Sequence, residues 1–299
     1  MVLLTNQQIG TWKRKRILVG SLLICWLILM FFTPKVPLHS FRHHVFADKR
    51  NFMGVPNTLN VMTNFPFLII GVLGFVLCLG GSFFNIRFPL SLSLSLSISE
   101  FLLMFNIFVF LIAYDKLNYV IKCSLKGEIW GWTLFYASVS SLAFGSAYYH
   151  LKPDDNRIVW DTLPILIAYS SLFSSFLVER AGERVGLSCL VLLLFISVFS
   201  VAYARVFNDL RLCLTFQLIP CLVIPVMTVL LPPKYTHSRF WLLATAAHAV
   251  SKIEGLADSK IYNFNGYTIS GHSLGHLCSA LAMVLLTVML LYRSIRFPR

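Results

Sequence analysis

Residues 271–292 read GHSLGHLCSALAMVLLTVMLLY, a run that is largely apolar after its first turn. A helix rises 1.5 Å per residue, so about 20 residues cross roughly 30 Å of hydrocarbon. The run therefore predicts a membrane-spanning helix. Its two histidines, His272 and His276, stand four residues apart and share one face of that helix.

Other runs of similar character extend over most of the chain. They lie at 17–33, 59–79, 130–150, 160–178, 186–204, 212–231 and 240–256. Of the 299 residues, 57% are hydrophobic and 12% are charged, whereas soluble domains carry about 25% charged residues. This composition excludes a soluble fold. We predict an all-α, polytopic transmembrane helical bundle with a seven-helix core and an extra N-terminal helix.

The net charge of +13 is spread over the loops between these runs. This distribution is typical of the flanks of membrane helices and argues against a nucleic-acid partner. The basic residues at 13–16 and the basic tail at 293–299 both favour the cytoplasm, and an even number of spans satisfies both. Residues 150–161 and 252–271 then lie together on the opposite side of the membrane.

Three parts of the chain follow from this topology. Residues 1–47 form a basic segment with the extra helix, 48–292 form the membrane domain, and 293–299 form the cytoplasmic tail. The stretch at 86–122 contains alternating leucine and serine at 90–97 and, if it crossed the membrane, would make the number of spans odd. It is expected to be an atypical insertion, either an interfacial or re-entrant hairpin or a segment outside the functional fold.

Five polar residues fall at one end of their predicted helices. Ser146 and His150 are four residues apart, Asp161 begins the next helix, and His272 and His276 begin the last. Ionisable groups at membrane depth cost a few kcal/mol and often mark function. Three histidines and one water form the ligand set of a catalytic zinc site. The alternative is that these histidines are separate, hydrogen-bonded residues at helix ends.

The remaining histidines are predicted to be solvated or satisfied by hydrogen bonds. They are His39, His43, His44, His237 and His248. The seven cysteines lie mostly inside apolar runs and contain no Cys-x-x-Cys pair, so they indicate small core residues.

The motifs SAYYH (146–150), VWDTLP (159–164) and HSLGH (272–276) resemble the alkaline ceramidase family. That family belongs to a superfamily of seven-helix metal hydrolases that includes the progestin and adiponectin receptors and the Per1-type proteins. The resemblance covers roughly residues 48–292, with the motifs in the family's order on helices two, three and seven. It implies a ceramide-type lipid substrate, cleaved to a sphingoid base and a fatty acid, and a location in the endoplasmic reticulum or Golgi.

The hypothetical mechanism gives each residue a role. Zn²⁺ is predicted at His150, His272 and His276, and the pKa of its bound water would fall from 15.7 toward about 7. Asp161 is the predicted general base and proton shuttle. Ser146 is predicted to hydrogen-bond the carbonyl oxygen as it gains negative charge.

The calcium site of the animal-type ceramidases is only partly matched. Asp48 is available, but the first family helix begins Pro56-Asn-Thr-Leu-Asn60 and lacks the family's glutamate. Calcium binding is therefore doubtful.

Three other functions stay open on the sequence. A receptor of the progestin and adiponectin type would share the metal site, although the short tail argues against it. A zinc hydrolase of another acyl lipid would need the same groups. A transporter should show inverted repeats, and none is evident.

Overall fold

The computed structural model describes residues 28, 30, 32–40, 44–79 and 126–296. Its helices are α2 (Thr58–Met62), α3 (Phe65–Leu79), α5 (Lys126–Leu151), α6 (Ile158–Ala181), α7 (Glu183–Phe207), α8 (Arg211–Leu230), α9 (Arg239–Leu256), α10 (Asp258–Phe264) and α11 (Gly271–Tyr292). Two isolated β-bridges are the only strand-like contacts in these residues. The all-α prediction is confirmed here, whereas the predicted insertion at 86–122 and most of the predicted helix at 17–33 lie outside the described residues.

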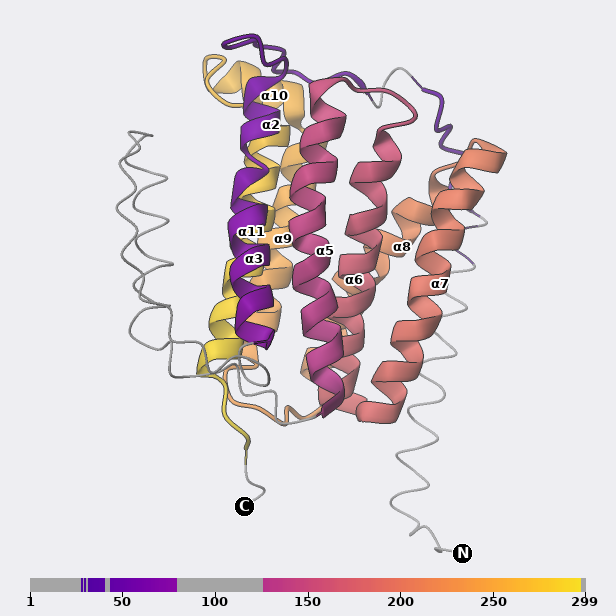
Figure 1. Ribbon diagram of the computed structural model, residues 1–299, viewed down its shortest axis with the longest axis vertical. Helices are drawn as coiled ribbons and strands as arrows, with labels where there is room; N and C mark the ends of the chain where they lie inside the picture. The colour runs from indigo at the N-terminus through magenta and orange to yellow at the C-terminus, as the bar shows by residue number, and fades with distance from the viewer. Residues whose placement is uncertain (1–27, 29, 31, 41–43, 80–125, 297–299) are drawn as a thin grey trace, which may run out of the picture.

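Consecutive long helices run in alternating directions, side by side along the long axis of the molecule (Figure 1). Short connections impose this order: residues 152–157 join α5 to α6, and Gly182 alone separates α6 from α7. The C-terminal end of α5 therefore meets the N-terminal ends of α6 and α11. We call this the histidine end, after His150 and His272, and the opposite end the arginine end, after Arg180 and Arg293.

Aromatic side chains fill the centre of the bundle around α5. Trp132 on α5 lies with its ring centroid 5.8 Å from that of Trp241 on α9. Phe176 on α6 meets the same tryptophan edge-on, at 5.0 Å between centroids. All three side chains are fully buried. The same helix, α5, also packs closely against α3 and α6.

Small residues let α6 and α7 approach closely. The Ser170 and Ser197 hydroxyl oxygens are 2.8 Å apart, and the Ser174 hydroxyl donates to the carbonyl of Gly186 at 2.8 Å. All four residues are buried. Interfaces of small residues that hydrogen-bond across helices are typical of packing within membranes, where apolar burial alone does not bring helices together.

Five helical stretches are long and apolar enough to cross a membrane. They are Thr58–Leu79, Ile158–Ala181, Glu183–Phe207, Arg211–Leu230 and Gly271–Tyr292. On α7, large apolar side chains such as Phe195 and Phe199 face outward and are well exposed, as lipid-facing residues are. The other long helices, α5 and α9, pack among these five but are less apolar. The seven-span core with an eighth, N-terminal helix stays a prediction.

The arginine end is closed by two buried ion pairs. Arg293, which the sequence places at the start of the tail, contacts Glu128 at 2.5 Å, and Tyr235 donates to the same carboxylate at 3.0 Å. Arg180 pairs with Glu179 at 3.2 Å. These four charged side chains are at most 2% exposed. Each buried carboxylate at this end therefore has a guanidinium partner within the chain.

Candidate metal centre

Three histidines converge at the histidine end. His150 comes from the last turn of α5, and His272 and His276 come from the first two turns of α11. Their ring centroids are 4.6 to 5.3 Å apart, and one potential ligand atom from each lies within 4.8 Å of the others. His150 is buried, while the other two are half-buried. The structure thus brings together the three residues that the sequence predicts as metal ligands, and they could hold a metal ion.

The spacing of the nitrogens suits a tetrahedral metal. The Nε2 atoms of His150 and His272 are 3.3 Å apart, and two nitrogens bound to zinc at about 2.0–2.1 Å with tetrahedral angles are separated by about 3.3–3.4 Å. The Nδ1 atom of His276 lies 2.9 Å from the Thr63 hydroxyl, which donates to the Leu59 carbonyl and therefore accepts from the ring. This tautomer leaves Nε2 of His276 free to bind a metal.

Two glycines allow the close helix contacts that bring these residues together. A Cβ atom at Gly275 would lie 2.8 Å from the carbonyl oxygen of Ser251 on α9, so α11 can approach α9 only with glycine there. At Gly145, a Cβ atom would overlap the carbonyl oxygen of Trp160 on α6. The glycine between the two histidines and the glycine before Ser146 are therefore part of how the sequence builds the centre.

Ser146 and Asp161 form a pair next to the histidines. Ser146 lies one turn before His150 on α5 and is 2% exposed. Its hydroxyl is a hydrogen-bond partner of the Asp161 carboxylate, which lies in the first turn of α6. Asp161 is half-buried, so a small molecule can still reach it. In this conformation the serine orients the carboxylate.

A segment before α2 covers the centre. The ring of Phe46 lies 4.7 Å from that of His150 and 4.8 Å from that of His272, measured between centroids. Asp258 joins the same segment to α11, because it accepts from the backbone N–H of Ala47 at 2.8 Å and from that of His272 at 2.7 Å. We call residues 33–40 and 44–57 the N-terminal strap. It shields two of the three imidazoles from solvent.

The connection between α5 and α6 is held from two sides. His39 and His44 of the strap contact the two carboxylate oxygens of Asp155 at 2.6 and 2.8 Å. Partial desolvation raises the pKa of Asp155, but these hydrogen bonds outweigh it and lower the pKa below its usual value. Arg205 of α7 donates to the Asp155 carbonyl at 2.8 Å and to the Asn156 side chain at 2.9 Å. Both contacts fix the loop that separates His150 from Asp161.

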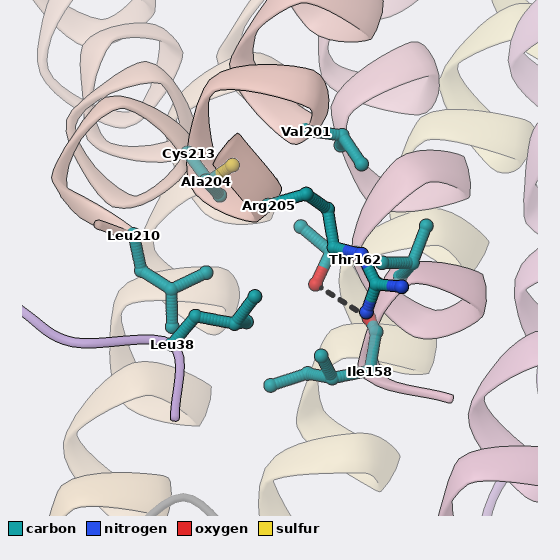
Figure 2. Close-up of a pocket in the computed structure, with 9 residues that line it drawn as sticks. Leu38, Ile158, Thr162, Val201, Ala204, Arg205, Leu210 and Cys213 are labelled. Carbon is teal, nitrogen blue, oxygen red and sulfur yellow. Dashed lines mark hydrogen bonds between the residues drawn. The ribbon is translucent and has the colours of Figure 1, made fainter. Parts of the chain in front are cut away.

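Figure 2 shows an apolar hollow between the strap and α6, α7 and α8, next to this loop. Leu38, Leu210 and Cys213 line it, and its one drawn hydrogen bond joins the Thr162 hydroxyl to the Ile158 carbonyl at 2.8 Å. None of the three clustered histidines lines this hollow. It is a packing feature beside the centre, separate from the candidate metal site.

Most of the other histidines have partners, as predicted. His248 is hydrogen-bonded to Tyr169 across the α6–α9 interface, and His237 lies 2.9 Å from the Thr236 hydroxyl. His39 and His44 bind Asp155. His43 lies outside the described residues.

Asp48, the one acidic residue available for a calcium site, is already paired. Arg50 contacts its two carboxylate oxygens at 2.9 and 2.7 Å. Burial raises the pKa of Asp48, but the hydrogen bonds from Arg50 outweigh it and hold the pKa below its usual value. The guanidinium thus occupies both oxygens that a calcium ion would use.

Comparison with protein families, curated proteins and solved structures finds no match to this chain. The case for its function therefore rests on the geometry of the centre and on the motif resemblance.

Lys252 is a residue of this centre that the sequence interpretation did not single out. It lies inside the predicted span 240–256 and is a charged neighbour of Asp161, His272 and His276. The signal was present, because a lysine within a membrane helix is as unusual as a histidine there.

Proposed function

We propose that this protein is a zinc-dependent membrane hydrolase that cleaves the amide of ceramide-type lipids to a sphingoid base and a free fatty acid. The observation that carries the proposal is the convergence of three imidazoles, one serine and one aspartate at the same end of the bundle. The resemblance of their three motifs to the alkaline ceramidases supplies the substrate class.

The ligand set fits zinc better than a hard cation. Three neutral imidazoles supply nitrogen donors, whereas calcium and magnesium prefer oxygen. Thr63 fixes the tautomer of one ligand, and the 3.3 Å nitrogen separation suits tetrahedral geometry. Zinc held there would supply a Lewis acid and would lower the pKa of a bound water toward about 7.

Asp161 and Ser146 would handle protons and charge. Asp161 would accept a proton from the water that adds to the amide carbonyl carbon. It would then pass the proton to the nitrogen as the C–N bond breaks, leaving a carboxylate and a free amine. Ser146, which now hydrogen-bonds Asp161, would turn its hydroxyl toward the carbonyl oxygen when substrate binds. Such a donor stabilises the developing oxyanion by about 3–4 kcal/mol in other hydrolases.

The position of the centre suits a lipid substrate. The centre lies at one end of a helical bundle, so an amide could reach the histidines while its acyl chains stay among apolar helices. We infer a multi-pass membrane protein of the endoplasmic reticulum or Golgi, and the organelle rests on the family resemblance alone.

The direct test is turnover by the purified protein. Fatty acid release from ceramides in detergent micelles or nanodiscs should accompany about one equivalent of zinc. Asp161→Asn should lower the turnover rate about 10²- to 10⁴-fold, the usual range for a general base. Glu183→Gln is the matched control, because Glu183 is an exposed acid at the arginine end.

Full activity in Asp161→Asn would reject the assigned base. Release of fatty acid from ester lipids but not from ceramides would assign the centre to another acyl lipid. Tight zinc binding without turnover of any lipid would favour the receptor alternative.

A further inference from the structure

The ammonium group of Lys252 lies where four helices meet. Lys252 belongs to α9, and its Nζ donates to the Gln217 side chain on α8 at 3.4 Å. Its ammonium also interacts electrostatically with the Asp161 carboxylate on α6 and with the two histidines of α11. The hydrogen bond to α8 and the electrostatic interactions with α6 and α11 place this side chain beside the candidate metal centre.

Other polar side chains continue inward from Lys252. His248 lies four residues earlier on α9, on the same face, and hydrogen-bonds Tyr169 of α6. Cys221 lies four residues after Gln217 on α8 and is a partner of the same tyrosine. Polar groups in a membrane bundle are costly and converge where they have a use. Here they form a row of polar side chains at the interface of α6, α8 and α9.

Lys252 is charged, accessible and without a paired acid. None of the ion pairs between described residues includes it. Lys252 is an exposed residue, and its side chain reaches Gln217 on the neighbouring helix α8. A divalent metal at the histidines would add two positive charges to that of Lys252, and together these exceed the negative charge of the nearby carboxylates of Asp161 and Asp258. This arrangement favours binding of an anion.

We propose that Lys252 and Gln217 form a subsite for the carboxylate of a long-chain fatty acid. The ammonium would bind the carboxylate, the Gln217 amide would hold the lysine in place, and the apolar faces of the surrounding helices would hold the alkyl chain. The subsite rests on the proposed function in one respect, since a fatty acid is the expected product. Binding itself requires no turnover.

The test measures binding of palmitate and of hexadecanol, an uncharged lipid of equal length, to the purified full-length protein in nanodiscs. In Lys252→Met, the Kd for palmitate should rise about tenfold, as expected for loss of a charge-assisted hydrogen bond. The Kd for hexadecanol should stay within about twofold. Lys252→Arg should retain palmitate binding. Lys260→Met, on α10 at the same end of the bundle, is the control lysine and should bind both lipids like the wild type.

Equal palmitate affinity in wild type and Lys252→Met would overturn the subsite, as would an equal loss of hexadecanol binding. If Lys252→Met does not fold, the wild-type preference for palmitate over hexadecanol and its retention in Lys252→Arg decide the matter. The two proposals fail separately. Charge-dependent palmitate binding without ceramide turnover keeps the subsite and rejects the hydrolase, and turnover without such binding does the reverse.

Discussion

The two ends of the bundle handle buried polar groups in opposite ways. At the arginine end, Glu128 and Glu179 are paired with Arg293 and Arg180, and all four are nearly inaccessible. At the histidine end, three imidazoles each bring a potential ligand nitrogen within 4.8 Å of the other two. Nδ1 of the buried His150 has no hydrogen-bond partner among the described residues.

This comparison distinguishes buried polar groups that stabilise the fold from buried polar groups that are candidates for a function. The ion pairs of the arginine end balance their charges within the chain and hold helix ends together. The converging imidazole nitrogens are potential metal ligands, so an ion bound there would add bonds that the chain itself does not supply. The arginine end therefore contributes to stability, and the histidine end carries the residues of the proposed function.

Removing a histidine should have the largest effect, and only at its own end. His276→Ala leaves two ligands, so zinc content should fall from about one equivalent to less than a tenth. Elemental analysis after gel filtration measures this. His237→Ala, in the connection before α9, should keep full zinc content. If the two variants contained equal amounts of zinc, the proposal that the metal binds at the histidine end would be contradicted.

Breaking an ion pair at the arginine end should cost stability and spare the metal. Glu128→Gln leaves Arg293 buried without its counter-ion, which should lower stability by about 3–5 kcal/mol. Thermal unfolding in detergent should show a large fall in Tm, while the protein that remains folded keeps its zinc. The exposed Glu183→Gln should change Tm little. Loss of zinc from folded Glu128→Gln would contradict the independence of the two ends.

A smaller effect on zinc affinity should come from the close contact between α11 and α9 at Gly275. Gly275→Ala places a Cβ atom 2.8 Å from a backbone carbonyl of α9, so α11 must shift. Such overpacking costs about 1–3 kcal/mol and should weaken zinc affinity. Gly255→Ala meets no atom within 4 Å and should be neutral or stabilising by up to about 1 kcal/mol. Competition with a chelator compares the two, and identical affinities would show that the close contact is not needed.

The smallest effect concerns the strap. Because the pKa of Asp155 is lowered in the folded state, its contribution to stability is present above its ordinary pKa and is lost as the pH falls through the folded value. Asp155→Asn should lower stability at pH 5 by less than about 1 kcal/mol, since the group is partly exposed. The difference in Tm from wild type should shrink toward pH 3. A difference that grows with acidity would contradict the role of Asp155.

The sequence predicted the long helices and the His272–His276 pair because both depend on local spacing. The predicted span 271–292 coincides with α11, and His272 and His276 share a face by helical periodicity. The meeting with His150 followed from topology, since short connections alternate helix direction. The sequence also predicted that Ser146 and Asp161 would lie near one end.

Contacts between segments far apart in the sequence could not be predicted, because local sequence patterns carry no information about them. The Phe46 contact with two ligand rings depends on how the strap folds over the bundle, and the Glu128 pair with Arg293 joins the first long helix after residue 126 to the end of the last. Lys252 was overlooked because its significance depends on Gln217 and Asp161, which belong to other helices.

X-ray absorption at the zinc edge of the purified protein tests the central claim most directly. The account predicts three imidazole nitrogens and one further nitrogen or oxygen donor at about 2.0–2.1 Å, with the imidazole signal reduced in His150→Ala. Sulfur donors at about 2.3 Å, or protein that retains no metal when purified without chelators, would contradict it.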